Sequence, residues 1–200
     1  MPEQSSLHVF LNWAKERIDE MDAALASFEA KASREKADLK PKVDQLIVDL
    51  KKRRDEFLAS LKAEAEAGEA AGARAKADLE AQWSGFEAQV KTYFETVGKQ
   101  IEQQQATFRD VAAAQARAWR EAVDTLTAEA AKVTAARRAD FDAAVKQMKA
   151  DAVEAEARFQ KLKQAGSESW TGLSAALAES RKAFDRANQE AWDAVKRAVH

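Results

Sequence analysis

The sequence predicts an all-α fold, either an elongated antiparallel coiled coil or a helical bundle of long helices. Three observations lead to this prediction. Apolar residues recur at alternating steps of three and four along most of the chain, which is the heptad spacing of packed helices. Charged residues make up 33% of the sequence and are interleaved with the apolar positions. Helix breakers are rare, with six glycines and two prolines among 200 residues.

The first long helix is expected to end near residue 67. One apolar stripe runs from Leu7 to Ala32, and a second runs from Leu39 to Leu61. Pro41 interrupts this segment, and proline removes a backbone donor and disfavours helical geometry in the preceding residue. Because the letters KADLKPKVDQL contain no Gly, Asn or Ser for a turn, a kink is predicted here, with a true helix break as the alternative.

Two glycines in the range 68–72 supply the first predicted turn, since glycine readily adopts the left-handed conformation that ends a helix. A further stripe then extends from Leu79 to Leu162 without a proline. Two layouts fit this stripe. Either Gly98 is a turn and two long-short hairpins pack together, or one helix is continuous over about residues 73–165. The apolar phase is kept on both sides of Gly98, which favours the second layout.

The last predicted turn lies in the letters QAGSES. Gly166 is expected to cap the end of one helix, and Ser167 is expected to cap the start of the next. This final helix carries its apolar stripe from Leu173 to Val195. The turn is interpreted as a bend between helices rather than a loop that carries chemistry.

The two glycine turns lie 98 residues apart, and many apolar positions match at that offset. The offset predicts two similar units, 1–98 and 99–200, each with a long helix, a turn and a returning helix. The turn lies near 68–72 in the first unit and near 165–168 in the second. Alternatively, the two units form one continuous elongated domain. Because 98 is a multiple of seven, two in-phase coiled coils without common ancestry would match as well. The mismatched pairs include Leu11 with Arg109, Leu39 with Arg137, and Trp83 with Arg181.

The run RFQKLKQAGSESWTGLSAALAESRKAF resembles the C-terminal part of small bacterial coiled-coil domain proteins that are labelled stress-response proteins. Those proteins carry a Leu, Ala, Ser, Trp turn, a Trp-x-x-Leu element, a second such element and a closing Phe. Leu162, Ala165, Ser167, Trp170 and Leu173 match the turn and the first element, and Phe184 matches the closing residue.

The match to this family is divided between the two units. Arg181 replaces the second Trp of the family, whereas the first unit has Trp83 and Phe86 there and Gly72 in place of the first Trp. The resemblance implies a helical protein linked to stress, in two tandem units. It carries over no active residues.

The sequence argues against an enzyme. The chain has no cysteine, and its only histidines are His8 and His200 near the two ends. It has no glycine-rich phosphate loop and no nucleophile elbow. Its carboxylates lie beside Lys or Arg, as on a solvated helix face. We therefore predict no catalytic, cofactor-binding or metal-binding residue and no cofactor.

Basic and aromatic residues could instead mark a binding surface. The basic runs 51–54 and 137–138 have acidic neighbours, so a solvated face is favoured over a phosphate or lipid site, and the near-balanced charge argues against nucleic acid. The five tryptophans are expected in the helical core rather than at a lipid surface. They are Trp13, Trp83, Trp119, Trp170 and Trp192. Without a signal peptide or an apolar run long enough to cross a bilayer, a soluble cytoplasmic protein is expected.

The function predicted from these features is that of a non-enzymatic coiled-coil scaffold or interaction protein with a link to stress. The alternative is a peripheral protein whose amphipathic helices bind an anionic membrane or a granule surface, as apolipoproteins and phasins do. Self-association as an antiparallel homodimer is also expected, because apolar residues flank the main stripe and the long helices contain no breaker to fold them back. The flanking residues are Phe10, Trp13, Val48, Leu58, Val111, Val145 and Val153.

Overall fold

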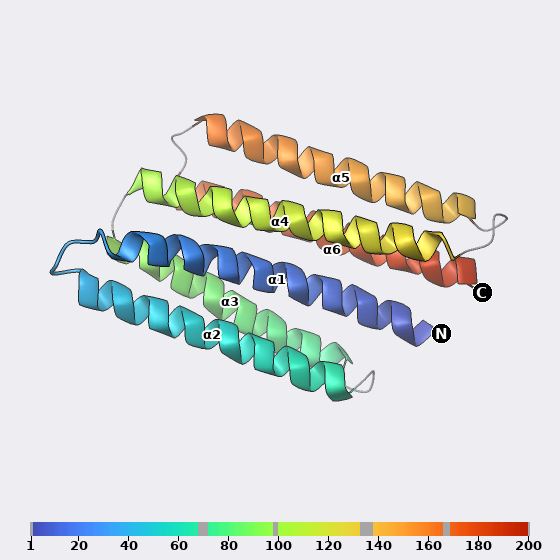
Figure 1. The fold of residues 1–200 in the computed structure, drawn as a ribbon, viewed down its shortest axis with the longest axis horizontal. Helices are drawn as coiled ribbons and strands as arrows, with labels where there is room; N and C mark the ends of the chain where they lie inside the picture. The colour runs from blue at the N-terminus through green and yellow to red at the C-terminus, as the bar shows by residue number, and fades with distance from the viewer. Residues whose placement is uncertain (1, 68–71, 98–99, 133–137, 166–168, 200) are drawn as a thin grey trace.

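The structure is a computed structural model that describes residues 2–67, 72–97, 100–132, 138–165 and 169–199. Within these ranges the chain forms six α-helices and no strand (Figure 1). The helices are α1 (Pro2–Ala32), α2 (Lys40–Ala67), α3 (Gly72–Val97), α4 (Ile101–Ala130), α5 (Arg138–Ala165) and α6 (Trp170–Val199). The all-α prediction is confirmed, in its helical-bundle form.

Pro41 marks a helix break, so the predicted kink is wrong. Helix α1 ends at Ala32 and α2 begins at Lys40. The carbonyl of Leu39 accepts hydrogen bonds from the amides of Lys42 and Val43, which makes Leu39 the residue that caps α2. Pro41 therefore stands in the first turn of a helix. A proline is tolerated there because the amides of the first turn have no acceptor within the helix.

The continuous helix over residues 73–165 is also wrong. Helix α3 ends at Val97, and the segment from Ile101 to Ala165 is divided into α4 and α5. Gly98 itself lies outside the described residues. Helix α4 ends without a glycine cap, since Ala131 keeps right-handed geometry at φ −65°. Two shorter helices are more stable than one long helix here, because the reversal of the chain buries the apolar stripes of α4 and α5 against neighbouring helices. One continuous helix would leave these stripes exposed to water.

Each half of the chain therefore has three helices rather than a long helix and a returning one. The predicted turn near 68–72 separates α2 from α3, and the one near 165–168 separates α5 from α6. Gly166 and Ser167 lie outside the described residues. The carbonyl of Ser169 accepts the first hydrogen bond of α6, from Leu173, so the cap position falls two residues later than predicted.

The helix ends repeat at the offset found in the sequence. The ends of α1 and α2 recur 98 residues later as the ends of α4 and α5, and the starts of α2 and α3 recur 98 residues later as the starts of α5 and α6. Heptad phase alone does not fix where a helix starts or stops. The repeated ends are what a duplicated three-helix unit would produce.

The two halves pack through their first helices. Figure 1 shows α1 and α4 side by side at the centre and running in opposite directions, with the α2–α3 hairpin on one side and α5–α6 on the other. The pairing is not symmetric, because α6 packs closely on both α4 and α1, whereas α3 makes few contacts outside α2.

The second layer that the flanking apolar residues require comes from the same chain. Trp13, Val111 and Val145 are buried, and Phe10 and Leu58 are half-buried, while Val48 and Val153 stay exposed. The premise of the homodimer argument, that nothing folds the long helices back, is wrong. Self-association stays a prediction. No helix of the described residues has the length and apolar character to cross a membrane.

Candidate functional site

A layer of buried polar side chains divides the apolar core of the bundle. On α4, Gln115 lies between the last residue of one core cluster, Ala112, and the first of the other, Trp119. On α6, Arg181 separates Leu177 from Phe184 in the same way. Buried charges are costly unless they are paired and hydrogen-bonded, so the partners of these side chains decide what the layer does.

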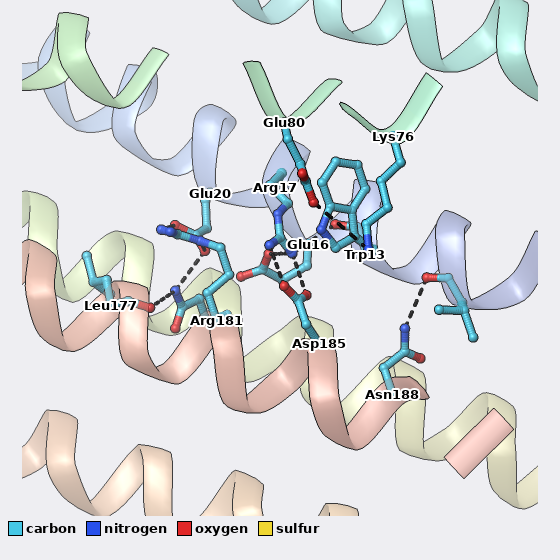
Figure 2. A network of polar contacts seen from close by, with 12 residues as sticks. Trp13, Glu16, Arg17, Glu20, Lys76, Glu80, Leu177, Arg181, Asp185 and Asn188 are labelled. Atoms are coloured by element: carbon cyan, nitrogen blue, oxygen red, sulfur yellow. Dashed lines mark hydrogen bonds and ion pairs between the residues drawn. The ribbon is translucent and has the colours of Figure 1, made fainter. Parts of the chain in front are cut away.

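Arg181 is paired with residues of two other helices, α1 and α3. Its Nε and Nη2 donate to the two carboxylate oxygens of Glu20 on α1, at 3.0 and 2.8 Å. Its Nη1 donates to Glu87 of α3 at 3.0 Å, and its guanidinium lies 4.5 Å from the ring centre of Trp83. The amide of Gln115 donates to Glu20 at 2.7 Å and to the carbonyl of Leu177 at 3.1 Å. These contacts join α1, α3, α4 and α6 around Arg181. Figure 2 shows Arg181 beside Glu20 and Leu177.

A second arginine forms the neighbouring part of the layer. Both Nη atoms of Arg17 donate to Asp185 of α6 at 2.7 Å, the two-point geometry that arginine favours with carboxylates. Arg17 also pairs with Glu16 at 3.0 Å and lies 4.6 Å from the ring centre of Trp13 (Figure 2). Further along the same interface, Asn188 accepts a hydrogen bond from Asn12 and donates one to the carbonyl of Val9. These bonds fix the register of α6 against α1.

The two buried glutamates of α1 differ in protonation. Burial raises the pKa of Glu16 well above its ordinary value, and the adjacent Glu20 carboxylate raises it further. Burial also opposes ionisation of Glu20, but Arg181 and the hydrogen bonds from Glu16, Arg181 and Gln115 outweigh it, so the pKa of Glu20 is lowered. Glu16 therefore holds its proton at a higher pH than an exposed glutamate does, next to an ionised Glu20.

A groove of about 410 Å³ opens beside the polar layer, between α3 and α6. Trp83, Phe86 and Val90 of α3 line one wall, and Trp170 and Leu177 are among the α6 residues that line the other. The α6 wall also carries the small side chains of Ser174, Ala175 and Ala178. Glu20, Glu87 and Arg181 line it as well. The groove is therefore largely apolar, and a fixed charge cluster borders it.

The residues weighed from the sequence fall mostly outside this site. Four tryptophans are buried as expected, and Trp170 is half-buried on the core, 4.5 Å from Phe94 between ring centres. In the basic run 51–54, Lys51 pairs with Glu29 and Arg54 with Asp22. Arg138 is exposed, and Arg137 lies outside the described residues. His8 stacks on Trp192, and His200 lies outside the described residues.

The sequence pattern did not single out Glu16, Arg17, Glu20 or Gln115, and it marked Arg181 only as a mismatch with Trp83 and with the second Trp of the resembling family. The available signal was a charged residue at an apolar stripe position, since Arg181 continues the spacing of Leu173 and Leu177 toward Phe184. Within the described residues, no group of three or more acidic, histidine or cysteine side chains could hold a metal ion. The carboxylates of Glu20 and Asp185 accept hydrogen bonds from arginines, which suits them to structural pairing rather than to proton transfer.

Comparison with protein-family models, curated proteins and solved structures finds no match to this chain. The geometry of the polar layer and of the groove is therefore the basis for inferring a function.

Proposed function

We propose that the protein is a non-enzymatic interaction protein, a helical bundle that receives an apolar helix of a partner protein in the groove between α3 and α6. The observation that carries this proposal is the groove itself. Two antiparallel helices form its walls (Figure 1), and aromatic and aliphatic side chains line it. Amphipathic helices bind to other proteins by laying their apolar face into a groove of this kind.

The shape of the groove favours a helix as the occupant. The α6 wall carries short side chains, at Ser174, Ala175 and Ala178. Short side chains allow the backbone of a packed helix to approach closely. Trp170 on the α6 wall is half-buried and presents aromatic surface to the groove, whereas Trp83 and Phe86 on the α3 wall are 7% and 2% exposed. Aromatic residues dominate binding energy at such sites. The charge cluster at Arg181 would fix the orientation of the incoming helix through its polar residues.

A blocked groove tests the proposal. The tagged protein, an Ala175→Trp variant and an Ala157→Trp variant are used to capture proteins from the source cell. Both alanines are exposed, but Ala175 lines the groove and Ala157 lies on α5 outside it. We expect a partner that wild type and Ala157→Trp retain and Ala175→Trp loses, and whose helical peptide binds the purified protein with the same ranking. Equal capture by all three proteins, or no peptide binding, would refute the groove as the site.

A lipid or granule surface is the alternative partner. The large apolar side chains that are exposed in the described part of the chain lie on four different helices, at Leu7, Val48, Ile101 and Val153. Scattered residues of this kind do not form a membrane-binding face. Flotation with anionic vesicles tests this alternative, since co-flotation of the wild-type protein would make lipid the partner instead of a helix.

We include a link to stress in this proposal only because the run around Gly166 resembles the bacterial stress-response proteins. This link predicts that the abundance of the protein rises when the source cell is exposed to heat or oxidants, and quantitative proteomics measures this directly. Constant abundance under both treatments would remove stress from the proposal and leave the groove unaffected.

A further inference from the structure

We infer that the α2–α3 hairpin is a lid, which swings away as a unit from the other four helices and so controls access to the groove. The inference rests on the proposed function for the identity of the occupant, but the motion itself belongs to the bundle. The packing of the helices gives the reason: α1, α4, α5 and α6 pack closely on one another, whereas the hairpin attaches to them mainly through α1.

The hairpin is held together internally. Helices α2 and α3 pack along their length, and the side-chain amide of Gln82 on α3 donates to the hydroxyl of Ser60 on α2 at 3.0 Å. Its outer attachments to α1 include the pairs of Arg54 with Asp22 and of Lys51 with Glu29. These pairs are at the surface, where ion pairs contribute little to stability. They add little resistance to a motion of the whole hairpin.

Helix α3 touches α4 and α6 at few points. Phe94 lies 4.5 Å from Trp170 between ring centres, and Tyr93 accepts a hydrogen bond from Gln103 at 2.6 Å. Glu87 and Trp83 both contact Arg181. Helix α6, the counterpart of α3 in the second half, makes two ion pairs with α1, the buried pair of Arg181 with Glu20 and the part-buried pair of Asp185 with Arg17. The two hairpins are therefore held with different strength.

Opening the lid leaves no buried charge without a partner. Arg181 would lose the ring of Trp83 and the carboxylate of Glu87, whose side chain is 44% exposed, and would keep both bonds to Glu20. The pair of Arg17 with Asp185 joins α1 to α6 and does not involve the hairpin. Opening thus avoids the largest electrostatic cost of separating helices in this bundle, which is a stranded buried ion. Its cost is the exposure of apolar residues such as Phe28, which lies against Tyr93 and Phe94.

Cysteine labelling tests the inference, because the chain has no native cysteine. Ala14 lies two heptads before Phe28 on the face of α1 that the hairpin covers, and it is fully buried. Ala112 is its counterpart 98 residues later. It lies one turn after Phe108, which contacts Phe159 of α5, and it is 7% exposed. Static exposure alone would make Ala112→Cys the more reactive thiol.

We expect the opposite order under native conditions. Opening of the lid should label Ala14→Cys at least about tenfold faster than Ala112→Cys, with a shallower urea dependence, because a partial opening exposes less surface than global unfolding. Circular dichroism records the global stability of each variant. Equal rates with the same steep urea dependence, or faster labelling of Ala112→Cys, would overturn the lid. If labelling fails while the groove variant still loses its partner, the partner binds the closed bundle and the proposed function stands.

Discussion

Replacement of Arg181 by methionine tests whether the polar layer holds the bundle together. The variant keeps a side chain of similar length but removes all the hydrogen bonds that Glu20 and Glu87 receive from α6. Glu20 is 2% exposed and would retain only its hydrogen bonds with Gln115 and Glu16, neither of which carries a positive charge. Removing one partner of a buried ion pair costs about 3–5 kcal/mol, because the other charge stays buried and uncompensated.

The expected loss is measured by urea unfolding, followed by circular dichroism at pH 7. For a chain of this size, a loss of that magnitude lowers Tm by roughly 6–20 °C. The double variant Glu20→Met/Arg181→Met should recover most of the stability, since apolar side chains of similar volume replace buried ion pairs at little cost. Lys52→Met is the control, because Lys52 pairs with Glu56 on the exposed face of α2, where we expect a change below about 0.5 kcal/mol.

Two results would refute this reasoning. One is a loss for Arg181→Met that is no larger than about 1 kcal/mol, the level of an exposed pair. The other is a double variant that is less stable than the single one. Either would mean that water reaches Glu20 in solution and that the layer does not act as a buried network.

Three further predictions concern single residues. Because the pKa of Glu16 is raised in the fold, its contribution to stability is present below the ordinary glutamate pKa and is lost as the pH rises from there through the raised pKa. The Glu16→Gln variant should therefore gain stability relative to wild type as the pH rises from 4 to 8, as measured by urea unfolding. A difference in unfolding free energy between the two proteins that stays constant over this pH range would contradict the prediction. Burial raises the pKa of Tyr93, the only tyrosine, to about 12, so its absorbance change at 295 nm should come well above that of an exposed phenol, and a midpoint near 10.0 would show that Tyr93 is solvated. Gly85→Ala in α3 should raise stability by about 0.5–1 kcal/mol in thermal unfolding, because the new methyl group meets only the mobile end of Arg53, and a loss of stability would show that Arg53 cannot move.

The heptad stripes were sufficient to predict helices and most of the buried apolar side chains, because the apolar face of a helix is stabilised by packing against the core. Helix ends were less predictable. Pro41 was compatible both with a kink inside one helix and with a position in the first turn of a new helix. The outcome depends on whether the chain buries more apolar surface when the following helix reverses direction and packs on the preceding one. The break after Ala130 has no local signal, since it follows from the packing of α4 on α5.

The polar layer could not be predicted from local sequence. Glu16, Arg17 and Glu20 look like ordinary members of a charged helix, although all three are buried. The partners of Glu20, which are Gln115 and Arg181, lie 95 and 161 residues away in the chain, and Asp185 lies 168 residues from Arg17. A pattern of charges within one helix carries no information about such pairs, because the helices can be stacked in many orders that keep every stripe covered.

The mismatch of Trp83 with Arg181 has a structural explanation in the bundle. Trp83 and Arg181 occupy equivalent positions 98 residues apart, and as unlike residues they counted against a repeated unit. In the bundle they touch each other, with the guanidinium 4.5 Å from the indole centre. Equivalent residues of two copies meet where the axis relating the copies passes, and there two identical large side chains would compete for one space. A tryptophan facing an arginine fills that space with one ring and one cation. If the two halves are copies of one unit, the charge that holds Glu20 would lie where the copies meet, and this mismatch would then be compatible with duplication.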